Sequence, residues 1–485
     1  MDISKKQFAI NSLWKILEQF SAKGISMLVS IVLARILLPN DYGLIALTAV
    51  FTNLSDILID GGFSTALIRK KTIDEYDYNA VFTVSFSMSV VLYGILFFIA
   101  PYVAEYYSSS ELVAVLRVIG LTFFFQAFNA VRNGIVNRSM QFKLLFLCNT
   151  VASLVSGILG IVLAYVGFGV WALVFQRLVQ QFILTVLLFI KVQWKFQWNF
   201  NFDRIRQMLP FSIGVIGSSF LNFLGGNIYN VVIGKKYSVS DLGYYDKGNQ
   251  LPMQFSLYTF GAISSVLLPT ISASQSDLER VKRIVRKVVA MTSFWLIPLM
   301  VGMILVAEEM IILIFTDKWL PSVRMMQYAS LYYLATPYML INVQVFFALG
   351  YSRLRVKTEV IRLILMSLGL FIFGFILDYS INTLALVGAV IAVLVSIVTY
   401  LEVWKLIHYK MSEVLGDMWK PIVCTILMTL TIIFVQYCLQ LENIMISITI
   451  KLIIGILVYV VSAIVLKVSE LKDILETLFR KNGHE

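Results

Sequence analysis

The chain has 485 residues, of which 59% are hydrophobic and only 14% are charged, and its net charge is +11. Soluble domains carry about 25% charged residues, so this composition excludes an ordinary globular enzyme or binding domain. Apolar stretches recur from one end to the other, each long enough to cross the roughly 30 Å hydrocarbon layer as a helix. A transmembrane β-barrel is also excluded, because its alternating segments of about ten residues do not occur.

The pattern therefore predicts an all-α integral membrane protein with about fourteen spans, since helices satisfy their own backbone hydrogen bonds in lipid. The first apolar stretch is too long for the core of a cleavable signal peptide. In chain order, the predicted spans lie near 9–37, 42–67, 80–101, 112–134, 144–166, 169–191, 208–234, 248–271, 286–306, 323–349, 356–377, 383–407, 420–439 and 445–467.

The basic residues set the predicted orientation. With the N-terminus in the cytoplasm, most of the 39 lysines and arginines fall in cytoplasmic connections, as the positive-inside rule requires. An even number of spans then places both termini in the cytoplasm. The charge of +11 is thus explained as a topology signal, and no nucleic-acid partner is expected.

Three connecting segments carry their own predictions. The aromatic-polar stretch Trp194–Phe202 is typical of an interfacial connector, with its rings at headgroup depth. The outer connection near 306–322 indicates a short amphipathic helix, with apolar residues from Met310 to Phe315. The tail Val468–Phe479 has one apolar helical face, which predicts a helix on the cytoplasmic surface.

The sequence resembles itself at an offset of 200 residues. The matched positions include Asp41-Tyr-Gly43 with Asp241-Leu-Gly243, and Gly61, Ser64 and Leu67 with Gly261, Ser264 and Leu267. Both copies begin on the inside, so the repeat predicts two parallel, pseudo-symmetric six-helix lobes related by an axis along the membrane normal. We expect lobes at 1–205 and 206–410, followed by two extra helices and the tail at 411–485.

A polar stripe marks the span near 42–67. Its members recur every four residues and so share one slowly drifting helical face: Thr48, Thr52, Asp56, Asp60 and Ser64. Ionisable residues inside a membrane are costly and usually line a cavity or a pathway. The stripe therefore predicts a wet cavity beside this helix.

Other polar residues extend the predicted cavity. The first lobe adds Lys15, Glu18, Lys23, Arg117, Arg177 and Gln180, and the more neutral second lobe adds Asn222 and Asn230. Fixed cations suit an anionic head group such as a pyrophosphate, and amides suit sugar hydroxyls. Simpler interpretations stay open: Lys15 with Glu18, and Glu359 with Arg362, fit intrahelical pairs, while Arg324 and Lys451 fit snorkelling at helix ends.

Several catalytic signatures are missing from the sequence. It contains no G-x-x-x-x-G-K-[ST] loop, and its two histidines and three cysteines are scattered. We therefore expect no metal and no cofactor. The outer connections are short, whereas a membrane glycosyltransferase or polymerase usually displays catalytic carboxylates on long outer loops, so a transporter is favoured over an enzyme.

Two blocks in the first lobe and one in the second carry a family resemblance. They are Leu33-Ala-Arg-Ile-Leu-Leu-Pro-Asn-Asp-Tyr-Gly43, Asp60-Gly-Gly-Phe-Ser-Thr-Ala-Leu-Ile68 and Asp241-Leu-Gly-Tyr-Tyr-Asp-Lys247. With them the chain resembles the polysaccharide transporter branch, O-antigen flippase-like or Wzx-like, of the multidrug/oligosaccharidyl-lipid/polysaccharide (MOP) flippase superfamily. It is most similar to the colanic and teichuronic acid exporters of that branch.

The resemblance implies an alternating-access flippase in the bacterial inner membrane. Its substrate would be undecaprenyl-pyrophosphate-linked oligosaccharide, turned from the inner to the outer leaflet for lipopolysaccharide or exopolysaccharide synthesis. Its partners would be that substrate, membrane lipid and other polysaccharide assembly proteins. On this interpretation the substrate-binding cations are Lys15, Lys23, Arg117 and Arg177, and the polar or coupling residues are Glu18, Asp56, Asp60, Thr52, Gln180, Asn222 and Asn230.

Two alternatives remain open at this stage. One is an ion-coupled multidrug exporter of the same fold, and the other is a membrane-embedded polysaccharide polymerase or ligase. Drug resistance without a glycan phenotype would favour the exporter. Build-up of lipid-linked units in the outer leaflet, rather than the inner, would favour the enzyme.

Overall fold

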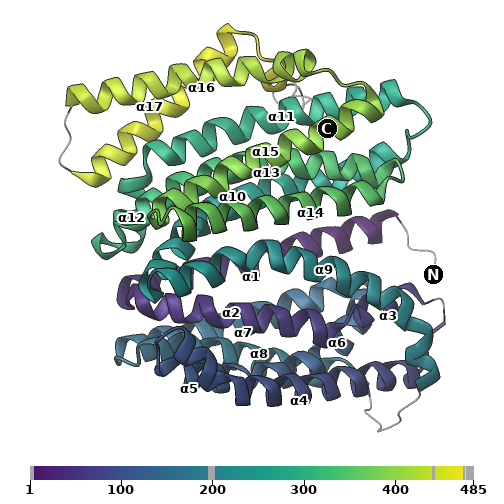
Figure 1. Cartoon of the computed structure of the whole chain (residues 1–485). Coiled ribbons are helices and arrows are strands. Elements are labelled where there is room, and N and C mark those ends of the chain that lie inside the picture. The colour runs from purple at the N-terminus through teal and green to yellow at the C-terminus, as the bar shows by residue number, and fades with distance from the viewer. Residues whose placement is uncertain (1–4, 71, 195–201, 440–442, 473–475, 477–485) are drawn as a thin grey trace. The chain divides into compact units, whose positions relative to one another are not determined.

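The computed structural model describes residues 5–70, 72–194, 202–439, 443–472 and 476, and within them every regular element is helical (Figure 1). The α-helices are α1 (Lys5–Ile36), α2 (Pro39–Asp60), α3 (Phe63–Arg69), α4 (Glu75–Tyr106), α5 (Glu111–Ile119), α6 (Thr122–Arg138), α7 (Phe142–Tyr165), α8 (Val170–Lys191), α9 (Phe202–Lys236), α10 (Val239–Ser272), α11 (Leu278–Leu305), α12 (Ala307–Phe315), α13 (Ser322–Ala348), α14 (Ser352–Gly369), α15 (Ile381–Ile407), α16 (Met411–Leu439) and α17 (Ile444–Val465). A short 3₁₀ turn covers Asp317–Trp319, and a π-helical segment covers Leu370–Ile376.

Thirteen helical stretches in the described residues are long and apolar enough to cross a membrane. The prediction of an all-α multi-pass membrane protein is thus confirmed. The first predicted span corresponds to α1, a single helix of 32 residues, which at about 1.5 Å per residue also exceeds the bilayer thickness.

Two of the predicted spans are broken within the membrane. Gly61 and Gly62 separate α2 from α3 and both have left-handed backbone angles, with φ of 54° and 68°. Only glycine adopts that region without steric cost, so the pair ends one helix and starts another. The span near 112–134 is interrupted between α5 and α6, at Gly120 and Leu121.

The chain divides by packing into two compact units, 1–243 and 244–485. In the first unit, α1 packs against α7, α7 against α8, α6 against α4 and α8, and α2 against α4, α6 and α9. Small residues allow the closest approaches, because a Cβ on Gly157 of α7 would lie 2.5 Å from the Val29 side chain of α1. The predicted lobe boundary after residue 205 concerns the internal repeat and stays a prediction.

The second unit is held by helix pairs α13 with α15, α11 with α13 and α16, and α16 with α17. At one end of α11 and α16, Arg286 donates to both carboxylate oxygens of Asp417 at 2.7 and 2.9 Å. Lys282 and Glu413 pair beside it at 2.9 Å. These pairs fasten the extra helices α16 and α17, through α16, to the rest of the unit.

The aspartate of the Asp-x-Gly motif has the same structural role in both copies of the internal repeat, which is to cap the start of a helix. The Asp41 carboxylate accepts a hydrogen bond from the Leu38 backbone N–H at 2.9 Å and so caps the start of α2. At the start of α10, the Asp241 carboxylate accepts from the Ser238 hydroxyl, which in turn accepts from the Asp241 N–H. Both aspartates therefore stand at the third helical position of a capping arrangement.

The connecting segments differ in how they match their predictions. The short helix predicted in the outer connection is α12, and it is confirmed. Trp194 is buried, because its ring packs edge-on against Phe82 and against the Arg132 guanidinium, and its placement at headgroup depth stays a prediction. The rest of that stretch up to residue 201, and half of the predicted tail helix, lie outside the described residues.

Candidate functional site

The polar stripe on α2 runs from the packed interior to an exposed position. Thr48 and Thr52 are fully buried, and their hydroxyls donate to carbonyls of their own helix. Asp56, one turn further along, is exposed. The stripe is therefore anchored at one end and accessible at Asp56.

Arg177 of α8 meets the stripe at this point. Its guanidinium donates to the Thr52 hydroxyl at 3.2 Å, and it is close enough to the Asp56 carboxylate for electrostatic attraction. A guanidinium carries five N–H donors, so one hydrogen bond to a neutral hydroxyl leaves donors for an anionic ligand. The structure thus joins three predicted residues from two helices into one half-buried polar site.

Amide side chains continue the polar face along α8. Gln180 donates to the Ser153 hydroxyl on α7 at 3.1 Å, and Gln181 accepts from the Asn129 amide on α6 at 3.3 Å. These bonds fix the orientation of α8 relative to its neighbours. They hold Arg177, one turn away from both glutamines, in a defined position.

Asp60 has a local structural role. Its carboxylate accepts hydrogen bonds from the Ser64 hydroxyl and from the Gly62 backbone N–H. Ser64 also donates to the Ala130 carbonyl of α6 at 3.0 Å. Asp60 therefore closes the break between α2 and α3, whereas Asp56 has no such bond to the break.

The polar residues of α1 lie against α7. Glu18 accepts from the Asn149 amide at 3.2 Å, and Ser21 lies 3.4 Å from the Thr150 hydroxyl. Lys23 is exposed, and the Lys15 side chain lies outside the described residues. The hydrogen bond from Asn149 thus joins Glu18 to α7.

Arg117 lies in a different environment from Arg177. Its guanidinium stacks 4.0 Å from the Phe97 ring centroid on α4 and donates to the Phe97 carbonyl at 3.3 Å. The two arginines therefore engage different helices. The structure assigns Arg117 an aromatic partner that was absent from the sequence prediction.

Asn222 and Asn230 lie on α9, which packs against α2 within the first unit. Asn222 is exposed and donates to the Ser218 carbonyl at 3.0 Å, and Asn230 is half-buried. Both amides are thus carried by a helix adjacent to the stripe.

Sequence reasoning missed the polar face of α6. Gln126, Asn129 and Asn133 recur at helical spacing, and this spacing was the signal that could have found them. Asn129 is buried and bonded to Gln181, while the Gln126 carbonyl oxygen is buried without a partner in the described structure. Ser153 on α7 is a second missed member, because an isolated serine has no pattern to mark it.

The assembled site suits a polar, anionic ligand better than a metal ion. It combines one guanidinium with hydroxyl and amide groups from three further helices, which supply both donors and acceptors. Among the described residues, no three His, Cys, Asp or Glu side chains cluster as metal ligands would. Charge-assisted hydrogen bonds from arginine to phosphate are among the stronger contacts available to such a site.

The chain matches a known family over most of its membrane region. Residues 32–324 match the family described as "Polysaccharide biosynthesis protein". It is 23% identical over 317 residues to the succinoglycan biosynthesis transport protein ExoT of Rhizobium meliloti, a match that spans 65% of this chain and 64% of that relative. It is 22% identical over 380 residues to the teichuronic acid biosynthesis protein TuaB of Bacillus subtilis, spanning 77% of each.

Solved structures show the same fold. The lipid II flippase MurJ, in an inward closed conformation, superposes with a TM-score of 0.71 at 16% identity, covering 94% of this chain and 98% of that one. An inward-facing multidrug resistance MATE family transporter of the MOP superfamily gives 0.64 at 14% identity, covering 81% and 98%. The chain therefore belongs to the polysaccharide biosynthesis protein family and has the fold of the MOP flippases.

Proposed function

We propose that this protein is a flippase for lipid-linked oligosaccharides. It turns undecaprenyl-pyrophosphate-linked repeat units from the inner to the outer leaflet of the bacterial inner membrane by alternating access. The product serves the synthesis of a surface polysaccharide, and both termini lie in the cytoplasm. Lipid-linked substrate and membrane lipid are its partners in this proposal.

One observation carries the proposal: a family of polysaccharide biosynthesis proteins is combined with a transporter fold over 94% of the chain. That fold is shared with a lipid II flippase, whose name specifies a lipid-linked cargo. Relatives named for succinoglycan transport and teichuronic acid biosynthesis support a glycan cargo. The internal repeat supports two lobes that rock about a central substrate site.

The Arg177 site supplies the chemistry that such a cargo needs. A pyrophosphate has several anionic oxygens, which a guanidinium binds in a bidentate manner. Asp56 beside it keeps the empty site close to neutral and competes with the cargo for Arg177, so release remains feasible. Lys15, Lys23 and Arg117 stay in the proposal as further cations, and Glu18, Asp60, Gln180, Asn222 and Asn230 as polar groups for sugars or coupling.

The decisive experiment locates the lipid-linked units in a deletion strain. We expect them to accumulate in the inner leaflet, protected from an enzyme or lectin added outside spheroplasts. Accumulation in the outer leaflet would contradict a flippase and favour a polymerase or ligase. Drug resistance on overexpression without a glycan phenotype would instead favour a multidrug exporter. This alternative is considered because a multidrug resistance MATE family transporter has the same fold.

Single substitutions then test the site. Arg177→Ala and Asp56→Asn should each reduce surface polysaccharide in a complementation assay at normal protein levels. Arg324→Ala is the matched control, because Arg324 is exposed on α13 and, among the described residues, donates to the nearby Gln327 of its own helix. Full activity of both site variants would remove the assignment of Arg177 and Asp56 without affecting the leaflet assay.

A further inference from the structure

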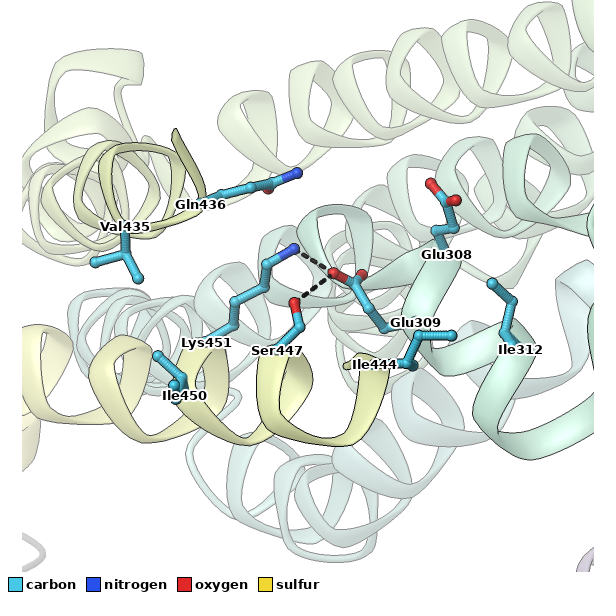
Figure 2. Close-up of a pocket in the computed structure, with 9 residues that line it drawn as sticks. All are labelled: Glu308, Glu309, Ile312, Val435, Gln436, Ile444, Ser447, Ile450 and Lys451. Carbon is cyan, nitrogen blue, oxygen red and sulfur yellow. Dashed lines mark hydrogen bonds and ion pairs between the residues drawn. The ribbon is translucent and has the colours of Figure 1, made fainter. Parts of the chain in front are cut away.

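A polar cavity lies within the second unit, between α12 and the extra helices α16 and α17 (Figure 2). Its volume is about 420 Å³, within the range of about 300–1,000 Å³ that small-molecule sites occupy. It is bordered by the end of α16 and the start of α17, which the predicted topology places at the outer face. The lining residues are Glu308, Glu309, Ile312, Val435, Gln436, Ile444, Ser447, Ile450 and Lys451.

The floor of this cavity is a preformed ion pair. Lys451 of α17 pairs with the Glu309 carboxylate of α12, and the Ser447 hydroxyl donates to the same carboxylate at 3.1 Å (Figure 2). Lys451 is 4% exposed, so it does not snorkel to the headgroups, and that sequence interpretation is wrong. Burial of an ammonium requires a partner, and Glu309 neutralises it.

Two polar groups on the rim have no such partner. The Glu308 carboxylate and the Gln436 amide border the cavity, and neither makes a hydrogen bond or ion pair with another residue in the described part of the chain (Figure 2). Because Lys451 cancels Glu309, the lining keeps one net negative charge, on Glu308. The cavity is therefore complementary to a single cationic hydrogen-bond donor.

The polar cavity also has apolar walls, and a separate apolar cavity lies further along the same two helices. A second cavity of about 430 Å³ between α16 and α17 is lined mainly by leucine and valine side chains. Thr431 of α16 lines it one turn from Val435, which lines the polar cavity. On α17, Val458 lies two turns from Lys451, so both cavities open on the same faces of the helix pair.

We propose that this pair of cavities binds an outer-leaflet phospholipid whose head group carries a primary ammonium. The ammonium donates to Glu308 and to the Gln436 carbonyl oxygen, and an acyl chain follows the apolar cavity between α16 and α17. A net negative lining repels head groups that carry only phosphate or pyrophosphate charge, so the cargo proposed above is not the occupant. The inference therefore does not rest on the proposed function.

The test is native mass spectrometry of the purified full-length protein in detergent, with phosphatidylethanolamine, phosphatidylcholine or phosphatidylglycerol added at equal concentrations. We expect phosphatidylethanolamine to be retained most strongly. Phosphatidylcholine carries the same charge but has no N–H donor, and phosphatidylglycerol has no cation. Glu308→Gln should weaken phosphatidylethanolamine retention by about tenfold, the loss of one charge-assisted contact.

Asp317→Asn is the control, because Asp317 is an exposed acid that follows α12 but does not line the cavity. It should retain phosphatidylethanolamine like the unmodified protein. Gln436→Leu, at an exposed position on α16, should weaken retention without disturbing the fold. Equal retention of phosphatidylglycerol by the unmodified protein, or undiminished phosphatidylethanolamine binding by Glu308→Gln, would overturn the proposal.

Discussion

Gly43 of α2 lies directly against the backbone of Val239 at the start of α10: a Cβ on Gly43 would stand 1.7 Å from the Val239 carbonyl oxygen. The reverse contact also occurs, since a Cβ on Gly243 would stand 2.1 Å from the Pro39 carbonyl oxygen. Both glycines and both carbonyls are 200 residues apart in sequence, 43 with 243 and 39 with 239. The two copies of the repeated motif thus contact each other reciprocally: the glycine of each copy packs against a backbone carbonyl at the start of the other copy's helix.

Gly43→Ala should therefore destabilise the protein, by about 1–3 kcal/mol for an overpacked contact. Within a helix, replacing glycine by alanine ordinarily stabilises a protein by about 0.5–1 kcal/mol. At Gly43 we expect the same substitution to lower the stability instead. Gly24→Ala on α1 is the control, because a Cβ there would meet nothing within 4 Å. Thermal unfolding in detergent compares the two, and equal stability of both variants would contradict the contact.

Asp77 and Asp74 at the start of α4 offer a matched pair of aspartates with opposite burial. Asp77 is fully buried and pairs with Lys70 at 2.6 Å, whereas Asp74 is 44% exposed and pairs with Arg204 at 2.9 Å. Asp77→Asn should cost about 3–5 kcal/mol, because it leaves Lys70 without its charge partner. Asp74→Asn should cost at most about 1 kcal/mol, since asparagine still caps α4 and an exposed pair contributes little.

The exposed Asp74 also predicts a small loss of protein stability in acid. Partial desolvation raises the pKa of Asp74, but the Asp77 backbone N–H and the Arg204 guanidinium outweigh it and hold the pKa below its ordinary value. A depressed folded-state pKa stabilises the protein at neutral pH, and this stability is lost as the pH falls below about 3.9. Between pH 6 and pH 3, the thermal unfolding midpoint should fall less steeply with pH in Asp74→Asn than in the unmodified protein. The same pH dependence in both proteins would exclude this contribution of Asp74.

The buried pair of Lys451 and Glu309 predicts a non-additive double mutant. Lys451→Met leaves a carboxylate without its cation in a partly buried site, at a cost of about 3–5 kcal/mol. Adding Glu309→Gln should recover much of that loss, because it removes the uncompensated charge. A double-mutant cycle of thermal stability measures this coupling, and strictly additive effects would show that the two groups do not interact.

A substitution of Thr52 tests whether its hydrogen bond fixes the orientation of the Arg177 guanidinium. Thr52→Val keeps the buried volume close to that of threonine but removes the acceptor of the 3.2 Å hydrogen bond. We expect near-normal protein levels and a several-fold fall in polysaccharide export, because the guanidinium loses its fixed orientation. Thr48→Val, one turn away and bonded only to its own helix, should export normally.

Much of the fold was predictable, because long apolar stretches report directly on membrane-spanning helices. The short helix α12 followed from an apolar run, and the intrahelical pair of Glu359 with Arg362 followed from spacing and is confirmed. The breaks at Gly61–Gly62 and near Gly120 were not predicted, since an apolar window continues across them unchanged. The burial of Trp194 was not predicted, because it depends on Arg132, which is distant in sequence.

The candidate site was predictable only in part, for a similar reason. Periodicity placed Thr52 and Asp56 on one face of one helix, but which helix faces them depends on packing between segments more than a hundred residues apart. Arg177 was found as a rare intramembrane charge and Thr52 as a member of the polar stripe, whereas the hydrogen bond between them was identified only by the structure. Asp60 had the same sequence signal as Asp56, and its hydrogen bonds from the Ser64 hydroxyl and the Gly62 N–H give it a different role.

The break at Gly61 and Gly62 has a mechanical consequence. Beyond it, α3 is tied to α6, because Arg138 donates to the carbonyls of Leu67, Ile68 and Lys70. The seven residues of α3 are thus fixed to α6, and the hydrogen bond from Ser64 to Asp60 spans the break between α3 and α2. A stretch that is continuous in hydropathy is therefore two separately anchored helices: Arg138 fixes the short α3 to α6, while Asp56 is carried by the longer α2, which has its own contacts with α4, α6 and α9.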